Sequence, residues 1–144
     1  PCDALKANEL YQRASQGGYQ KGAQEDVASI GRGIAGNKGR VRVSFGTPLG
    51  AGLATADAVA AEIDRQVISN YCLHPTNIYA YQMLNPDAPA LPDTLTAEPG
   101  DCTREQFERR IAAMPGPHQP YALAIYANAV VSKLALRAGA PAPC

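Results

Sequence analysis

The sequence has little of what marks the commonest classes of functional site. Its 13 Lys and Arg residues balance 13 Asp and Glu residues, so the formal net charge is zero. No overall field therefore directs the chain to nucleic acid or to an anionic surface. Only two histidines and no C-x-x-C pair are present, and this leaves no spacing suited to a metal site. We expect neither a metal nor a cofactor.

Long apolar runs are also absent. The longest, residues 121–132, is interrupted by Asn128, which suits a packed helix better than a bilayer crossing. No signal peptide is apparent. Four cysteines lie far apart along the chain: Cys2, Cys72, Cys102 and Cys144. We expect mostly reduced thiols of a cytoplasmic protein, with a secreted, disulfide-bonded domain as the less favoured alternative.

Residues 31–36 spell G-x-G-x-x-G, but their context is wrong for a dinucleotide site. That fingerprint needs a strand before the glycines and a helix after them, because the pyrophosphate binds at the helix N-terminus. Here apolar residues at helical spacing precede the glycines over residues 25–34, and alternating apolar residues follow over 40–46. The glycines therefore end a helix and lead into a strand, with Gly36 or Gly39 expected at a positive φ.

Local patterns predict a mainly α-helical chain with one clear strand at about residues 40–46. Asp3, Thr55, Thr76 and Thr103 are the expected N-caps of four helices. The helix after Thr55 has the clearest apolar stripe, which we expect to face the core. The stripe consists of Ala56, Val59, Ile63, Val67 and Tyr71. Further helices are expected over residues 25–34 and 120–137, the latter ended by Gly139.

The predicted strand has no recognisable neighbour. A solitary strand leaves the hydrogen-bonding groups of both edges unpaired. Its partner is an extended segment that the patterns do not mark, a second copy of the chain, or sequence outside this chain. The last alternative is favoured, because Pro1 follows no Met and a piece of a longer protein would begin in this way.

Five segments carry a resemblance to a known family. They read Asp3-Ala4-Leu5-Lys6-Ala7, Tyr19-Gln20-Lys21-Gly22, Glu25-Asp26, Gly39-Arg40-Val41-Arg42-Val43-Ser44-Phe45-Gly46-Thr47-Pro48-Leu49 and Asn70-Tyr71-Cys72-Leu73-His74-Pro75-Thr76-Asn77. This succession resembles the C-terminal part of bacterial glycerophospholipid acyltransferases, the relatives of 1-acylglycerol-3-phosphate acyltransferase. The resemblance covers roughly residues 1–84, which it implies are the C-terminal segment of an acyltransferase-like domain. The composition of residues 85–102 predicts a proline-rich linker, and a two-helix tail over 103–144 follows, where no match to the family is found.

The resemblance implies an α/β fold in which residues 40–46 join a central sheet between helices. It also implies a place in phospholipid biosynthesis: transfer of an acyl group from acyl-CoA or acyl-carrier protein to the hydroxyl of a lysophosphatidate-like lysophospholipid. The expected location is cytoplasmic, with peripheral association at the inner membrane left open. No nucleic-acid partner is expected.

The chain departs from the family at the reacting groups. The family pairs a His with an Asp after four intervening residues, the His acting as general base. Here Tyr79 stands at that position after His74, and Leu123 after His118. We therefore assign no catalytic residue and expect the chain alone to be inactive. His74 is expected to be a structural imidazole at a helix junction, and His118 an exposed loop residue.

Lys21 and Arg40 are the candidate substrate-binding residues, because their side chains could approach a phosphate of the acceptor or of the acyl donor. For Arg40 the competing interpretation is the solvated face of the strand. A different class of function also stays open: a non-catalytic helical interaction module that pairs its strand with a second copy as a homodimer.

Overall fold

The computed structural model describes residues 2–36 and 41–139, and in these residues the chain is mainly helical, as predicted. The elements follow in the order α1 (Cys2–Gln16), α2 (Glu25–Ala35), α3 (Ala56–Asn70), α4 (Pro75–Leu84), α5 (Arg104–Ala112), the 3-10 turn η1 (Gly116–His118) and α6 (Gln119–Arg137). No helix in this part of the chain is both long and apolar enough to cross a membrane.

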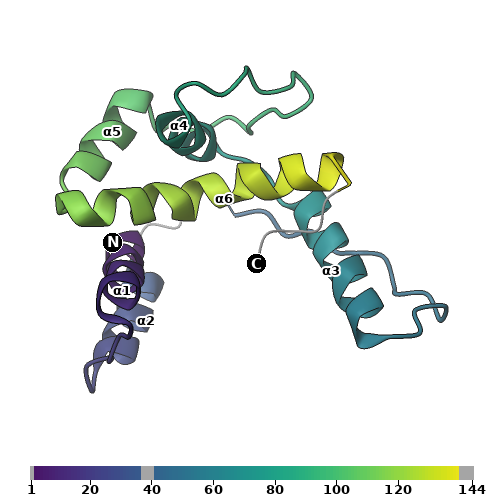
Figure 1. The fold of residues 1–144 in the computed structure, drawn as a ribbon, viewed down its shortest axis with the longest axis horizontal. Helices are drawn as coiled ribbons and strands as arrows, with labels where there is room; N and C mark the ends of the chain where they lie inside the picture. Colours follow the sequence, from purple (N-terminus) through teal and green to yellow (C-terminus); the bar gives the residue numbers. More distant parts are fainter. Residues whose placement is uncertain (1, 37–40, 140–144) are drawn as a thin grey trace.

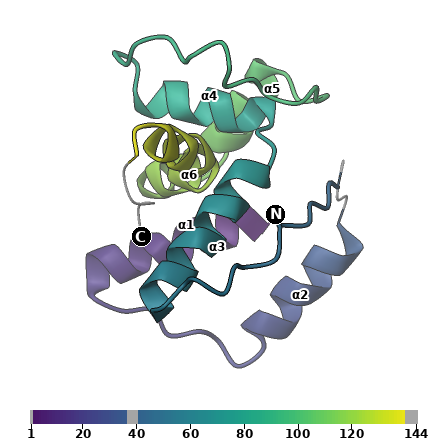
Figure 2. The same cartoon turned by 90° about the vertical axis from the view of Figure 1, so that its right-hand side faces the viewer.

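Helix α6 is the element on which the others are arranged. Figure 1 shows it lying across the molecule, with α4 and α5 on one side and α1 and α3 on the other, and the view in Figure 2 agrees. Pro120 lies in its first turn and Arg137 in its last, as suits a helix start and a helix end. Gly139 follows at φ +69°, so the predicted glycine stop is confirmed.

The main core lies where α1, α4, α5 and α6 meet. Small residues let these helices approach closely: Ala7, Ala80, Ala122 and Ala127 are almost fully buried. Phe107 of α5 fills the space between them and packs edge-on against Tyr126, with ring centroids 5.1 Å apart. Burial of one such large apolar side chain stabilises the fold by about 1.5–3 kcal/mol.

A second apolar cluster holds the loop between α4 and α5 against α6. Leu73, Leu95 and Val130 are its buried members. Leu73 and Ala97 form a parallel β-bridge, and the Glu98 N–H donates to the Leu73 carbonyl at 2.7 Å. Leu95 of the expected linker over residues 85–102 thus lies in this cluster, and Leu91 and Ala97 pack against it. The division of the chain into three parts stays a prediction.

Two of the predicted N-caps, Thr55 and Thr103, are confirmed, and a third, Thr76, is wrong. The Thr55 hydroxyl accepts from the Ala58 N–H, and Thr103 and Gln106 form the expected capping box. Thr76 is not an N-cap, because α4 begins at Pro75 with His74 at the cap position. The Asn77 side chain there accepts from the His74 N–H at 2.7 Å. Because Pro75 has no N–H to satisfy, it is well suited to the first turn.

Two further predictions concern residues 36–46, and the one on the strand was wrong. Gly36 has φ −72° and so does not take a positive φ, while Gly39 lies outside the described residues. The strand predicted at 40–46 is not formed: residues 41–50 are coil up to a turn at 51, and the described residues contain only the isolated Leu73–Ala97 bridge. Arg40 lies outside the described residues. A strand exists only through pairing, and no neighbouring strand is present in this part of the chain.

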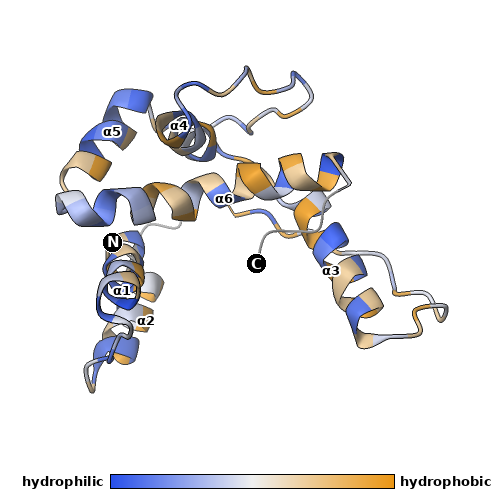
Figure 3. Ribbon diagram, viewed as in Figure 1, coloured by the Kyte–Doolittle hydropathy of each residue, from blue (hydrophilic) through white to orange (hydrophobic). Residues whose placement is uncertain are grey.

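The apolar stripe of α3 is also not buried as expected. Ile63 and Val67 are 45% and 54% exposed, whereas Ile68, on the next position round the helix, is buried. Figure 3 shows apolar stretches along α3 at a distance from α6. The helical period was right, but the face that meets the rest of the chain is a different one.

Asp3 is not a helix cap, because α1 already begins at Cys2. Its carboxylate instead joins three helices: Oδ2 accepts from the Tyr126 hydroxyl at 2.8 Å and from the Arg110 guanidinium at 2.7 Å. Burial alone would raise the pKa of Asp3, but the bonds from Arg110 and Tyr126 outweigh it and lower that pKa well below its usual range. Burial and the bond to Asp3 raise the pKa of Tyr126 to about 12.

We predict that Asp3→Asn lowers the free energy of unfolding at pH 7 by about 1–2 kcal/mol. Because the folded-state pKa is depressed, this contribution is present above the ordinary value of 3.8 and is lost as the pH falls below it. Urea unfolding of both proteins at several pH values from 7 to about 2 measures the difference. A difference that stays constant over this range would contradict the role of the carboxylate charge.

Candidate functional site

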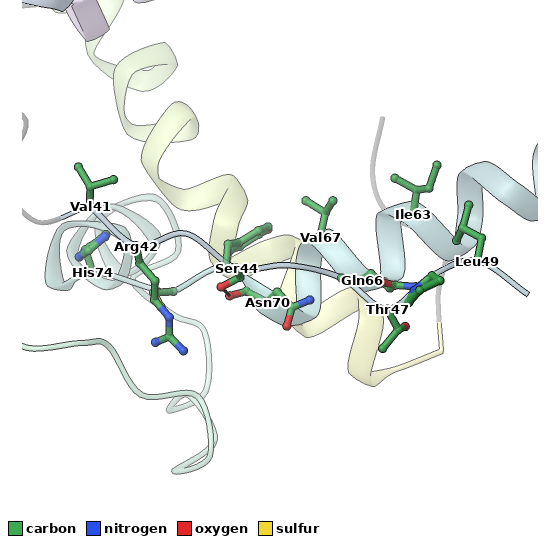
Figure 4. A pocket seen from close by; sticks show the side chains of 14 residues that line it. Val41, Arg42, Ser44, Thr47, Leu49, Ile63, Gln66, Val67, Asn70 and His74 are labelled. Carbon is green, nitrogen blue, oxygen red and sulfur yellow. Dashed lines mark hydrogen bonds between the residues drawn. The ribbon is translucent and has the colours of Figure 1, made fainter.

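An open groove of about 870 Å³ lies between residues 41–49 and α3 (Figure 4). Val41, Leu49, Ile63 and Val67 give it apolar walls. Polar side chains also line it, among them Arg42, Ser44, Thr47, Gln66, Asn70 and His74. By exposed surface area, most of the lining is apolar. The groove is therefore a surface to which another apolar segment can bind.

Residues 41–46 keep the alternation of a strand although they pair with none. Arg42 forms an ion pair with Glu98 at 2.8 Å, and the Ser44 hydroxyl lies 3.4 Å from the Asn70 carbonyl. A Cβ added to Gly46 would lie 2.2 Å from Gln66 Oε1. The even positions therefore contact the rest of the chain, with the period of two that a strand requires.

The odd positions of this segment are exposed to solvent, Val41 at the open rim of the groove. Val41 and Val43 are each 72% exposed, and Phe45 is 90% exposed. Three large apolar side chains in alternation on one exposed face are unusual for a surface that stays uncovered. The face of the segment that is suited to a core is thus the face that the described chain does not cover.

The backbone of the segment also lacks hydrogen-bond partners among the described residues. No backbone hydrogen bond joins residues 41–50 to any other residue that the structure describes. Their N–H and C=O groups are exposed to water, as on an edge strand that is open to pairing. The segment therefore offers both an apolar face and a hydrogen-bonding edge.

Helix α2 adds a third exposed apolar surface. Val27, Ile30 and Ile34 repeat at helical spacing along it and are 62–75% exposed, and no residue of α2 is buried. The predicted amphipathic helix is confirmed. Its apolar stripe faces solvent in this structure, so it does not contribute to the helical core.

Of the two predicted substrate-binding residues, the structure describes Lys21 but not Arg40. Lys21 lies in the loop between α1 and α2, where its Nζ is 2.7 Å from Asp26 Oδ1, and this ion pair raises the pKa of Lys21. It does not line the groove. Arg40 lies outside the described residues. Arg42 does line the groove.

The histidines lie in different parts of the fold. His74 is exposed, precedes α4 and lines one end of the groove. His118 was expected to be an exposed loop residue; it is half-buried in η1, and its ring lies 5.0 Å from that of Tyr11. Within residues 2–36 and 41–139 no group of three His, Cys, Asp or Glu side chains is placed to hold a metal. Cys72 and Cys102 are free thiols.

Sequence reasoning missed the contribution of α3 to the groove. Ile63 and Val67 were predicted to be core residues, and Gln66 received no role. The signal was present in the apolar spacing of this helix, but spacing identifies a face and not the neighbour that covers it.

A scan against protein-family models and searches of curated proteins and of solved structures found no match to this chain.

We predict that Phe45→Ala changes the free energy of unfolding of the isolated chain by less than about 0.5 kcal/mol, because the side chain is exposed. Phe107→Ala, which removes a ring of the same size from the core, should cost about 3–5 kcal/mol. Urea unfolding followed by circular dichroism compares the two. A loss above about 1 kcal/mol for Phe45→Ala would show that this ring is buried within the chain.

Proposed function

We propose that this chain is the C-terminal, non-catalytic part of an acyltransferase of the bacterial glycerophospholipid class. Its residues 40–46 would supply a strand to the central sheet, and its helices would cover that sheet. The observation that carries the proposal is the exposed alternation of Val41, Val43 and Phe45 on a backbone segment without hydrogen-bond partners among the described residues.

The α/β fold that the family resemblance implies gives these surfaces a common use. In such a fold a strand is buried between helices on both faces. The exposed stripes of α2 and α3 lie on either side of residues 41–46 in the sequence and have the helical spacing of sheet-covering faces. Burial of Val41, Val43 and Phe45 alone would contribute about 5–8 kcal/mol before the entropic cost of ordering the segment.

The reaction would be the transfer of an acyl group from acyl-CoA or acyl-carrier protein to a lysophosphatidate-like hydroxyl. The general base would come from the rest of the enzyme, because neither His74 nor His118 has an aspartate at the family spacing. The expected compartment is the cytoplasm, at the face of the inner membrane where such lipids lie. Arg40 stays a candidate for binding phosphate, whereas Lys21 is less suited because Asp26 already neutralises its charge.

A second function is favoured by one specific observation: α1, α4, α5 and α6 enclose a core of their own. Such a core can fold without a sheet, as a helical interaction module would. Residues 41–45 could then pair with a second copy. An antiparallel pair centred on Val43 places Arg42 opposite Ser44, so that no like charges face each other.

We predict that the chain alone shows no acyl transfer from acyl-CoA to lysophosphatidate, because it supplies no paired base. Release of free thiol from the CoA measures the reaction. Turnover that is abolished by His74→Ala would overturn the assignment of this chain as non-catalytic.

The sharper experiment supplies the missing part. The catalytic portion of a bacterial acylglycerol-phosphate acyltransferase, truncated before its own strand corresponding to residues 40–46, is mixed with this chain. We predict recovered turnover, because residues 40–46 restore the sheet. Val43→Glu should abolish the recovery, since it would bury a charge on the docking face. Ala112→Glu, which adds the same charge on the exposed surface of α5, is the matched control.

Light scattering after size exclusion separates the two functions. Failure of the mixture together with a dimer of this chain that dissociates on Val43→Glu would favour the interaction module. Failure of the mixture with a monomeric chain would contradict both.

A further inference from the structure

We propose that Lys133 and Arg137 form a binding site for a phosphate monoester at the end of α6. They line a groove of about 310 Å³ together with residues from the end of α3 and from the loop over residues 94–98. Lys133 and Arg137 themselves lie in the part of the chain to which the family resemblance does not extend, although the end of α3 falls within it, and the proposal does not depend on the proposed function.

The two cations are held in place by neutral groups. The Arg137 guanidinium donates to the Thr94 hydroxyl at 2.7 Å and to the Thr94 carbonyl at 3.1 Å. Lys133 Nζ donates to the Ser69 carbonyl at 3.2 Å and lies 5.1 Å from the centroid of the Tyr71 ring. These contacts use only part of the donors of each side chain. The remaining donors are available to an anion without a large ordering cost.

Neither cation is neutralised within the described part of the chain. Other cations have carboxylate partners: Lys6, Arg13, Lys21, Arg42, Arg65, Arg104 and Arg110. Lys133 and Arg137 form no ion pair with a described carboxylate. Arg32 and Arg109 also form none, but they lie on separate helices and line neither groove. Lys133 and Arg137 therefore stand out because they share a concave surface.

Glu98 lines this groove but already has a cationic partner. Glu98 forms an ion pair with Arg42 at 2.8 Å. The C-terminal end of the α6 dipole is negative and favours nearby cations, but it amounts to about half a charge spread over the last turn. It cannot balance two full charges four residues apart. Burial is the largest cause of the lowered pKa of Lys133; the neighbouring Cys72 opposes it and the Arg137 charge adds to it, and a net lowering is typical of a cation without a paired carboxylate.

The chemistry of the lining selects the ligand class. A guanidinium, an ammonium and the hydroxyls of Ser69, Thr94 and Thr96 are donors suited to the several acceptor oxygens of a phosphate. The exposed lining of this groove is more polar than apolar, and the groove is smaller than the one beside α3, so it suits a phosphate group better than an acyl chain. A free phosphate monoester and a phosphatidate headgroup present the same chemistry to these residues.

The test titrates the whole chain with inorganic phosphate in low-salt buffer and follows the amide resonances of Thr94, Thr96 and α6. We expect saturable shifts there that chloride at the same ionic strength does not produce. Arg137→Gln and Lys133→Gln should each weaken binding about tenfold, the loss of one charge-assisted hydrogen bond. Arg65→Gln, which removes a cation already paired with Glu62, should bind as the unchanged protein does.

Lys133→Arg keeps the charge and should retain binding, so a loss through misfolding is distinguished from a loss of charge. Co-sedimentation with vesicles of phosphatidate in phosphatidylcholine, compared with phosphatidylcholine alone, identifies the source. Binding of phosphate with no phosphatidate-dependent sedimentation assigns a free ligand, and binding in both assigns a lipid headgroup. The absence of saturable shifts, or equal affinity in Arg137→Gln and the unchanged protein, would overturn the site.

Discussion

The backbone of residues 41–50 has hydrogen-bonding groups that no other described residue satisfies, and this constraint shapes the interpretation of the whole structure. In water these groups cost little, but burial of the apolar side chains of the segment would also bury its backbone edges. The segment can therefore leave solvent only by pairing with another strand. Because the described chain offers no such strand, Val41, Val43 and Phe45 stay exposed, and so do the stripes of α2 and α3.

The helical core does not share this constraint. Helices satisfy their own backbone groups, so α1, α4, α5 and α6 need only apolar faces and close packing to associate. Ala7, Ala80 and Ala127 supply the close packing, and the Asp3 carboxylate joins α1 to α5 and α6 through Arg110 and Tyr126. The molecule thus combines a self-sufficient bundle with an open surface. A non-catalytic part of an acyltransferase and a strand-pairing module would both make use of this combination.

The sequence predicted what depends on near neighbours. Thr55 and Thr103 were recognised as caps because capping acts over three residues, and the stop at Gly139 follows from its tolerance of positive φ. The strand at 40–46 was predicted from its alternation, and that alternation persists in the contacts of Arg42 and Ser44. Whether the segment forms hydrogen bonds with a neighbouring strand could not be predicted from the segment alone, because such pairing requires a partner. For the same reason spacing alone placed Ile63 and Val67 in a core that they do not enter.

The smaller groove shows a different limit of sequence reasoning. Arg137 ends the helix predicted over 120–137, and a cation in the last turn of a helix needs no further explanation. That it meets Thr94 could not be seen while residues 85–102 were interpreted as a linker, because the contact spans 43 residues. Nothing in the sequence was a reason to assign Lys133 a role, since a single lysine on an amphipathic helix is ordinarily a solvated residue. Both cations became informative only when the fold showed which carboxylates they do not reach.

The most direct measurement is amide hydrogen exchange of residues 41–49, read residue by residue in the isolated monomeric chain and again in the mixture with the truncated catalytic part. The account predicts exchange near the rate of unstructured peptide in the monomer, beside slow exchange in α6, and protection at alternate amides in the mixture. Slow exchange of these amides in the monomer would contradict it, because they would then already have partners within this chain.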